Sequence, residues 1–311
     1  MTIAIAIHGG AGVIRRDDMS PEKEQAMRAG LDAALEAGHG VLARGGSAMD
    51  AVIAAVTSME DNPNFNAAKG AVFTLDGTIE LEAAVMDGAT QDAGTVTGVT
   101  CVKNPVRLAR RVMEATPHVT LAGKAADHFA QRQGLECVDP GYFFTETRWR
   151  ALQEEKARLA KGGSEADVPE HRKHGTIGAV ALDAEGRLAA ATSTGGRTAK
   201  WPGRVGDTAV IGAGTWADRT CALSCTGHGE MFMRAAAAHD VAARMKYLGQ
   251  GLQEACGAVV LDTLVQLGGT GGMIGVDARG NVAMPINCEG MYRGMVDGEG
   301  RRMVAIYADE Q

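Results

Sequence analysis

The sequence predicts an α+β fold in which helices are layered on antiparallel sheets. Short β-patterned runs recur around Asp-Gly or Asp-x-x-Gly turns, and helix-patterned stretches come in separate runs, which argues against a parallel doubly wound sheet. The chain also has 42 glycines among 311 residues but only 3 Trp, 4 Tyr and 6 Phe. We therefore expect close backbone approaches and an interior of small aliphatic side chains.

Helix signals divide the chain in order. Ser20 and Pro21 are typical of a helix start, and the apolar stripe that follows ends at Gly38. Ser47 to Asp50 resembles a capping box and predicts a second helix to about Met59. The remaining helices are expected over residues 105–115, 120–133, 145–160, 230–247 and 252–266.

Strand signals lie between these helices. The apolar run 3–8 predicts a buried first strand. Hairpins are expected for 70–75 with 78–86, for 177–182 with 187–192, and for 272–276 with 281–286, with a closing strand over 303–307.

Composition excludes several classes of protein. The net charge of −7 and the absence of a basic patch argue against nucleic-acid binding. No apolar run reaches the ~20 residues that span a bilayer, and the N-terminus does not resemble an export signal. Six cysteines are sparse for this length, so we expect reduced thiols and a cytoplasmic protein. Cys221 and Cys225 are interpreted as core residues because no partner pair has zinc-ligand spacing.

The segment from about 153 to 175 differs from the rest. It is rich in Asp, Glu, Lys and Arg, has no aromatic residue and contains Gly162 and Gly163, so a mobile surface linker is expected within an otherwise single domain, 1–311. Gly175 and Thr176 end the segment, and the buried strand pattern begins at once.

Thr176 at this junction has two explanations. Threonine favours strands and glycine is common at strand entry, so the pair can be purely structural. Alternatively, scission of the Gly175–Thr176 bond would give Thr176 an α-amino group with a pKa of about 7.7–8.0, which can accept the proton of its own hydroxyl. One residue would then supply both nucleophile and base. The hydroxyl could make the cut itself by attacking the Gly175 carbonyl.

Two later stretches offer binding groups. Arg204 can clamp a carboxylate through parallel hydrogen bonds while Asp207 accepts an ammonium, although a surface ion pair is the alternative. The glycine-rich run 225–230 enters a helix, where backbone N–H groups can stabilise an oxyanion, or simply begin the helix.

With these residues in place, the chain resembles the plant-type (class 2) asparaginases, or isoaspartyl peptidases, of the N-terminal nucleophile hydrolase superfamily. The resemblance extends over nearly the whole chain. It rests on the motifs at 7–12, 65–67, 70–73, 85–88, 174–181, 191–196, 203–207, 212–214, 226–230 and 290–293.

The resemblance implies a four-layer αββα sandwich that cleaves itself into an α subunit (1–175) and a β subunit (176–311), assembled as (αβ)2. It implies hydrolysis of L-asparagine and β-aspartyl dipeptides without an organic cofactor. The implied residues are Thr176 as nucleophile, Thr194 as its neighbour, Arg204, Asp207 and the Gly229 carbonyl for the substrate's carboxylate and amine, Thr226 and Gly227 for the oxyanion, and Asn66 near the nucleophile.

A sodium-binding loop is also implied by the resemblance, through backbone carbonyls of Met59, Glu60, Asn62, Phe65, Ala67 and Lys69. One departure falls inside this loop. The family's usual Asn-Ala-Gly is here Asn66-Ala67-Ala68, which bears on the conformation of the loop.

Three other readings remain open from the sequence. Gly212-Ala-Gly214 fits a dinucleotide fingerprint, but no helical pattern follows it. An uncleaved binding scaffold would keep the motifs without the chemistry. A glycosylasparaginase is the nearest competitor within the superfamily, and the opening 7–12 and the expected lack of an export signal argue against it.

Overall fold

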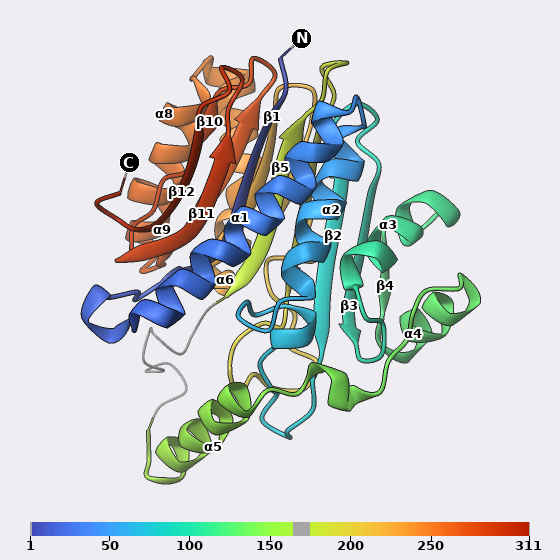
Figure 1. Ribbon diagram of the computed structural model, residues 1–311, viewed down its shortest axis with the longest axis vertical. Coiled ribbons are helices and arrows are strands. Elements are labelled where there is room, and N and C mark those ends of the chain that lie inside the picture. Colours follow the sequence, from blue (N-terminus) through green and yellow to red (C-terminus); the bar gives the residue numbers. More distant parts are fainter. Residues whose placement is uncertain (1, 164–174, 311) are drawn as a thin grey trace.

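The computed structural model describes residues 2–163 and 175–310. Two sheets pack face to face, and each carries helices on its outer side (Figure 1). Helices α1–α3 cover the larger sheet and α7–α8 contact the smaller one. This arrangement confirms the predicted α+β class and the four-layer order of helix, sheet, sheet and helix.

The larger sheet has eight strands in the order β12-β11-β1-β5-β6-β2-β3-β4. All its pairs are antiparallel except β3 with β4. The strands are β1 (Ala4–Gly12), β2 (Leu81–Asp87), β3 (Ala93–Val99), β4 (Thr120–Ala122), β5 (Thr176–Leu182), β6 (Leu188–Thr194), β11 (Gly290–Val296) and β12 (Arg302–Tyr307).

The smaller sheet is antiparallel, with the order β10-β9-β8-β7. Its strands are β7 (Thr215–Ala217), β8 (Cys221–Gly227), β9 (Gly271–Asp277) and β10 (Val282–Ala283). Strands β8 and β9 lie against β5 and β1 of the larger sheet. The strand that begins at Thr176 therefore lies in the interior of the sandwich.

Side-chain alternation explains why β1 and β5 are buried on both faces. In β5, Ile177 and Ala179 point to the core under α1 and α2, whereas Val180 and Leu182 point to the core between the sheets. A strand covered on both sides needs apolar residues at every position, and the pattern of 176–182 is continuous in this way. The core between the sheets is rich in alanine, as expected for a chain with few aromatic residues.

The helices follow their capping signals closely. Ser20 and Ser47 accept hydrogen bonds from the backbone N–H groups of Lys23 and Asp50, which fixes the starts of α1 and α2. The α-helices are α1 (Pro21–Ala43), α2 (Ala48–Glu60), α3 (Pro105–Ala115), α4 (Gly123–Arg132), α5 (Glu146–Ala160), α6 (Gly229–Ala235), α7 (Ala237–Ala243), α8 (Leu252–Gly257) and α9 (Leu264–Gln266).

Shorter helical turns complete the outline: the 3-10 turns Arg16–Asp18, Ala68–Gly70 and Pro140–Phe143, and the π-helical stretches Arg244–Leu248 and Ala258–Thr263. The helix expected over 230–247 is interrupted at Ala236, which has a left-handed backbone (φ 46°).

The hairpin expected for 70–75 with 78–86 is wrong. Residues 74–78 form a tight turn, with Thr74 N–H donating to Thr78 O, but strand β2 pairs with β3 and β6 instead. The Asp76-Gly77 signal was therefore a turn without a hairpin. Strand β3 and strand β11 carry glycines inside them, and the sequence patterns missed both.

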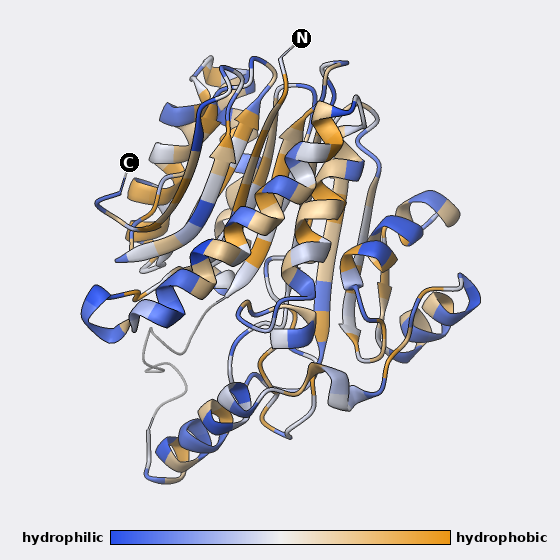
Figure 2. Ribbon diagram, in the orientation of Figure 1, coloured by the Kyte–Doolittle hydropathy of each residue, from blue (hydrophilic) through white to orange (hydrophobic). Residues whose placement is uncertain are grey.

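The segment expected to be a linker from 153 is helical at its start. Helix α5 continues to Ala160. Glu155 in this helix is buried, and both its carboxylate oxygens accept hydrogen bonds from Arg158. Most of α5 is nonetheless hydrophilic (Figure 2). The rest of the expected linker, 164–174, lies outside the described residues.

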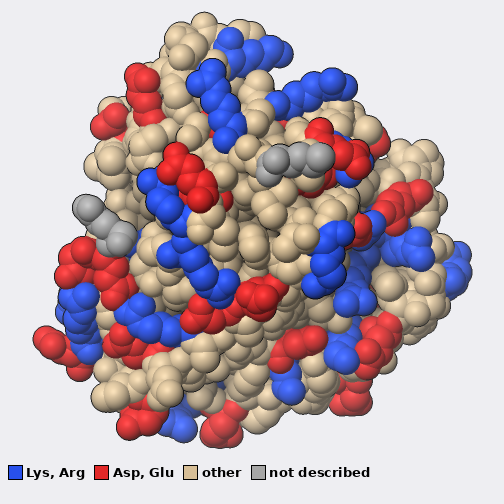
Figure 3. Space-filling view, turned by 45° about the horizontal axis from the view of Figure 1, so that its top comes forward, with Lys and Arg blue, Asp and Glu red and all other residues tan. Residues whose placement is uncertain are grey.

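Charges are mixed on the surface. On the face shown in Figure 3, Lys and Arg side chains alternate with Asp and Glu, and no continuous basic patch covers it. None of the helices in the described part of the chain is long and apolar enough to cross a membrane. Cys221 and Cys225 are fully buried in the core beneath α7 and α8, as expected.

Candidate active site

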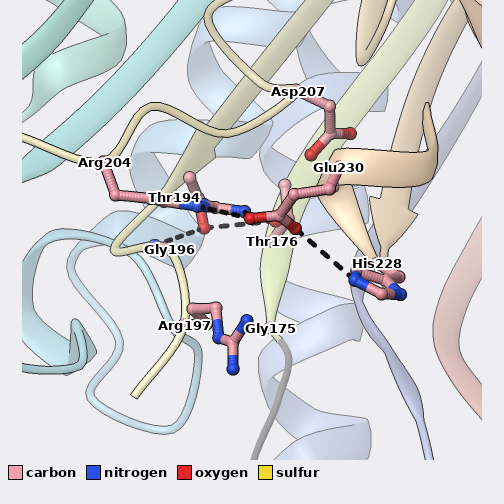
Figure 4. A pocket seen from close by; sticks show the side chains of 11 residues that line it. Gly175, Thr176, Thr194, Gly196, Arg197, Arg204, Asp207, His228 and Glu230 are labelled. Carbon is pink, nitrogen blue, oxygen red and sulfur yellow. Dashed lines mark hydrogen bonds and ion pairs between the residues drawn. The ribbon is translucent and has the colours of Figure 1, made fainter. Parts of the chain in front are cut away.

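Thr176 is the first residue of β5, and Thr194, the last residue of β6, lies directly opposite it (Figure 4). The Thr176 hydroxyl donates to Thr194 Oγ1 at 3.1 Å. The same Thr194 oxygen accepts the N–H of Gly196 at 2.9 Å. Sheet register and a turn thus hold the acceptor in place, and the hydroxyl of Thr176 is aimed by the fold.

Gly175 packs closely against Asn66, so a larger residue there would force a neighbour to shift. A Cβ atom at this position would stand 2.6 Å from the Asn66 Cβ. The Asn66 side chain turns towards the neighbouring loop, where its Nδ2 donates to Gly196 O at 2.6 Å and its Oδ1 accepts the N–H of Val72 at 2.9 Å. Asn66 therefore lies beside the Gly175–Thr176 bond, as predicted, and braces the turn that holds Thr194.

Arg204 forms an ion pair, but with a different partner from the one considered in the sequence. Its Nε and Nη2 donate to Glu230 Oε1 at 3.1 and 3.0 Å. The pair with Asp207 is not formed within ion-pair distance. Glu230 was not singled out from the sequence, although it lies in the same short run as Gly227 and Gly229. Its carboxylate keeps the guanidinium pointed into the pocket (Figure 4).

Asp207 is 4% exposed, and its Oδ2 has no hydrogen-bond partner. Burial raises the pKa of this carboxyl to about 7, against the opposing effect of Arg204. Gly229 packs so closely that a Cβ there would lie 2.6 Å from Asp207 Oδ1. A buried carboxylate oxygen without a donor is costly unless a ligand satisfies it, so the site suits a small cation such as an ammonium group.

The glycine-rich run enters helix α6 as expected. Gly227 has φ 149° and packs against Gly271, where a Cβ would lie 2.6 Å from the Gly271 Cα. Gly227 and Gly229 line the pocket, whereas Thr226 is buried behind it and its Oγ1 accepts the N–H of Ala11 at 3.2 Å. The oxyanion role of Thr226 and Gly227 stays a prediction.

His8 was assigned no role from the sequence, but the structure places its side chain against the backbone carbonyl of Thr176. It is fully buried, and its ring bridges Thr176 O at 2.9 Å and Ser224 Oγ at 2.8 Å. Burial lowers the pKa of His8 to about 3, so the ring is neutral and its Nδ1–H donates to the Thr176 carbonyl. The only sequence signal was a polar residue at the end of an apolar strand.

A second unpredicted pair supports the loop that carries Arg204. Lys200 and Glu82 are both buried, with Nζ 3.8 Å from Oε1. Glu82 also accepts the N–H of Gly206 at 3.0 Å, and Lys200 Nζ donates to Glu80 O at 2.8 Å. These bonds fix the chain between Thr194 and Asp207. No periodic pattern in the sequence marks either residue.

The pocket at the candidate nucleophile Thr176, called the nucleophile pocket below, is small. It is lined by Gly175, Thr176, Thr194, Gly196, Arg197, Arg204, Asp207, Gly227, His228, Gly229 and Glu230. Its free volume is about 20 Å³, enough for roughly one water molecule. The intact Gly175–Thr176 bond forms part of its wall.

Asn66 belongs to the loop 59–70, for which the sequence resemblance implies a sodium site. Ala68, at the position of the family's usual glycine, takes a left-handed backbone with φ 43°, so the loop keeps a conformation that favours glycine. The carbonyls of Met59, Asn62 and Ala67 already accept backbone N–H groups. Among the described residues, no cluster of His, Cys, Asp and Glu side chains could hold a metal ion.

The dinucleotide reading of Gly212 to Gly214 is wrong. Gly212 lies in a turn with φ 89°, and the chain continues into the β7–β8 hairpin instead of opening a helix. A dinucleotide phosphate site of this type requires the N-terminus of a helix at that point.

Comparisons with known proteins agree with the family resemblance of the sequence. The sequence model of the asparaginase family matches residues 1–306. The chain is 51% identical to an isoaspartyl peptidase of Escherichia coli (strain K12), over 93% of this chain and 91% of the relative. It is 43% identical to a plant-type L-asparaginase of Thermococcus kodakarensis, over 95% and 97%, and 41% identical to an isoaspartyl peptidase/L-asparaginase of Rattus norvegicus, over 90% and 82%. The chain therefore belongs to the asparaginase family, a family of hydrolases.

Proposed function

We propose that the protein hydrolyses L-asparagine and β-aspartyl dipeptides after cutting its own chain between Gly175 and Thr176. The observation that carries this proposal is the Thr176 hydroxyl, which donates to Thr194 beside a glycine whose replacement by a larger residue would crowd Asn66. The names of the relatives, isoaspartyl peptidase and plant-type L-asparaginase, support the same substrates.

Self-cleavage requires attack of Thr176 Oγ on the Gly175 carbonyl. The peptide bond is exchanged for an ester, and water then opens the ester. The products are a carboxylate on Gly175 and a free α-amino group on Thr176. The His8 bond to the Thr176 carbonyl supports this step because it holds the residue in place on the side opposite to the bond that breaks.

Substrate hydrolysis uses the new amino group. Thr176 Oγ attacks the side-chain carbonyl of the substrate while the Thr176 amine takes the hydroxyl proton and passes it to the leaving nitrogen. Ammonia or an amino acid leaves, and a β-aspartyl ester remains on Thr176. Water activated by the same amine hydrolyses this ester and releases aspartate.

Recognition of the aspartyl group is assigned to Arg204 and Asp207. Arg204, held by Glu230, can take the substrate's α-carboxylate through two N–H donors. The unpartnered Asp207 Oδ2 and the Gly229 carbonyl would accept its α-ammonium. Arg204 and Asp207 lie in one loop, which is held in place by the Glu82 carboxylate and by close packing against Gly214.

The loop 59–70 fits a sodium ion through its carbonyl oxygens. The loop is tightly folded on itself, because a Cβ at Gly70 would come within 2.6 Å of Pro63 O. Carbonyl oxygens are the hard ligands that such a cation prefers. A bound sodium ion would stabilise the loop that carries Asn66, and no chemical step passes through it.

Assembly as (αβ)2 is supported by an apolar patch on the outer helices. Tyr247, Leu248, Leu261 and Val265 are each more than half exposed. Arg244 lies 3.5 Å from Thr263 Oγ1, which brings the two helical stretches together. Such a patch on the surface is typical of an interface with a second copy.

The direct test is an assay of the purified protein with L-asparagine and β-aspartyl-leucine. We expect release of ammonia from the first and of leucine from the second. A protein that cuts itself but hydrolyses neither compound would contradict the proposed substrates. Hydrolysis of a glycosylated asparagine in preference to both would favour the glycosylasparaginase alternative.

A further inference from the structure

A second cleft meets the nucleophile pocket at Gly175. It has a volume of about 760 Å³ and is lined by residues of β1 and of the segment that follows it, of α1 and of the start of α5. Gly175 and Asn66 form its inner end. Since Gly175 also lines the nucleophile pocket, a substrate with its aspartyl group beside Arg204 would extend its other end into this cleft.

The cleft is cationic although the chain has a net charge of −7. Arg15, Lys23 and Arg148 line it, against the single carboxylate of Asp18. Arg15 is already neutralised by two hydrogen bonds to Glu289, at 2.8 and 3.0 Å. Lys23 and Arg148 are therefore the charges that need an anion.

Arg148 is half-buried, and its Nε donates to the carbonyl of Gly70 at 2.9 Å. No carboxylate of the described residues lies within ion-pair distance of it. Lys23 Nζ donates to the neutral Asn64 side chain at 2.8 Å. Lys23 and Arg148 both line the cleft, and burial together with the nearby Arg148 charge lowers the pKa of Lys23. An anion between them would relieve this repulsion.

The apolar part of the lining is close by. Ile14, Met19 and Met27 border the same cleft, and methionine side chains adapt to ligands of different shape. The combination of two cations with flexible apolar side chains matches an amino acid that presents a carboxylate and a variable side chain.

We propose that the second cleft binds the leaving amino acid of a β-aspartyl dipeptide, with Arg148 and Lys23 attracting its terminal carboxylate and Ile14, Met19 and Met27 contacting its side chain. This inference rests on the proposed function and adds a specificity site to it. Asparagine, whose leaving group is ammonia, would not use the cleft.

The test compares β-aspartyl-leucine with β-aspartyl-leucinamide, which lacks the terminal charge. In the processed wild-type enzyme we expect kcat/KM about tenfold higher for the acid, since an opposite charge at close range in a partly exposed site has an effect of this order. In Arg148→Met and in Lys23→Met the acid-to-amide ratio should fall towards one, with Arg148→Lys in between. Arg150→Met, on the same helix outside the cleft, should keep the wild-type ratio.

Two results would overturn the inference. Equal kcat/KM for acid and amide in the wild type would show that the cations do not recognise the terminal carboxylate, including the case in which the new carboxylate of Gly175 occupies them. If kcat/KM of Arg148→Met fell by the same factor for the acid and for the amide, Arg148 would have a structural role only. Turnover of asparagine in the same preparations separates either result from a failure of the proposed function.

Discussion

The two hollows that meet at Gly175 are built in different ways. The nucleophile pocket has a free volume of about 20 Å³, and backbone atoms, glycines and an Arg–Glu pair fix nearly every group in it. The second cleft is about 760 Å³ and is bordered by long flexible side chains. Under the proposed function, this difference predicts strict selection of the aspartyl group and broad tolerance of the amino acid attached to it.

The contrast also has a consequence for the uncut chain. The intact Gly175 forms a wall of the nucleophile pocket, and the remaining space is too small for an aspartyl group. The polypeptide that has not been cut should therefore be inactive for a steric reason, in addition to lacking the amine of Thr176.

The largest effect is expected from removal of the nucleophile. Thr176→Ala should lower kcat for asparagine by about 10⁴-fold or more, because nucleophile and base are lost together. Thr176→Ser, which keeps a hydroxyl, should retain measurable turnover. Activity of the alanine variant near the wild-type level would remove Thr176 from the mechanism.

Arg204→Ala tests the proposed recognition of the aspartyl group in the nucleophile pocket. We expect kcat/KM to fall about a hundredfold for asparagine and dipeptides alike, mainly through KM, because two charge-assisted hydrogen bonds to the α-carboxylate are lost. Steady-state kinetics with both substrates measures this. Arg234→Ala, an exposed arginine on the adjacent helix α6, is the matched control and should change neither constant. If Arg204→Ala lost dipeptide turnover but kept asparagine turnover, Arg204 would contact the leaving amino acid and not the α-carboxylate of the aspartyl group.

The buried Asp207 carboxyl should lower the free energy of unfolding at neutral pH. Its pKa is about 7 in the folded chain and about 3.9 when unfolded, so the folded chain binds the extra proton between these values and its stability falls as pH rises through this window. In the uncut Thr176→Ala background, Asp207→Asn should be more stable at pH 8 by on the order of 2–4 kcal/mol, and nearly equal at pH 4. Urea unfolding at both pH values measures the difference. Equal stability at pH 8 would mean that Asp207 has a donor.

Gly229→Ala should disturb the nucleophile pocket by steric contact alone. Its new Cβ would lie 2.6 Å from Asp207 Oδ1 and 3.0 Å from Arg204 Nη2. A displacement of either group should lower kcat/KM about tenfold, since small misplacements of binding groups are costly. Gly251→Ala, where nothing lies within 4 Å and φ is −71°, is the control.

The smallest effect concerns the loop next to the second cleft. Ala68 has φ 43°, a conformation that costs a residue with a Cβ about 1–2 kcal/mol. Ala68→Gly should relieve this strain but increase the entropy of the unfolded chain, for a net gain of about 0.5–1 kcal/mol. Thermal unfolding of the variant checks the sign. A loss of stability would show that the Cβ of Ala68 packs favourably enough to outweigh the strain.

Sequence reasoning predicted the fold where local rules decide it. Serine caps fixed α1 and α2, and the continuous apolar run of 176–182 identified a strand covered on both faces. It failed where the partner strand is distant. The Asp76-Gly77 turn suggested a hairpin, but β2 finds its partners at 93–99 and 188–194, a choice that depends on packing of the whole sheet.

The site was predicted to a similar extent. Thr176, Arg204 and Asp207 were singled out because their chemistry is visible in short motifs; the structure brings all three to one pocket, and their roles stay predictions. His8, Glu82 and Lys200 were missed because they act through the backbone of residues far away in the sequence. No periodicity or spacing marks such a contact before the fold is known.

The central claim is that an internal threonine becomes the start of a chain. N-terminal sequencing and intact mass measurement of the purified protein, sampled as its hydrolytic activity appears, test this directly. We expect the 32.3 kDa chain to divide into two fragments, one of which begins with Thr176, in proportion to the activity. Full activity in a preparation that contains only the undivided 32.3 kDa chain would contradict self-cleavage between Gly175 and Thr176 as the source of the activity.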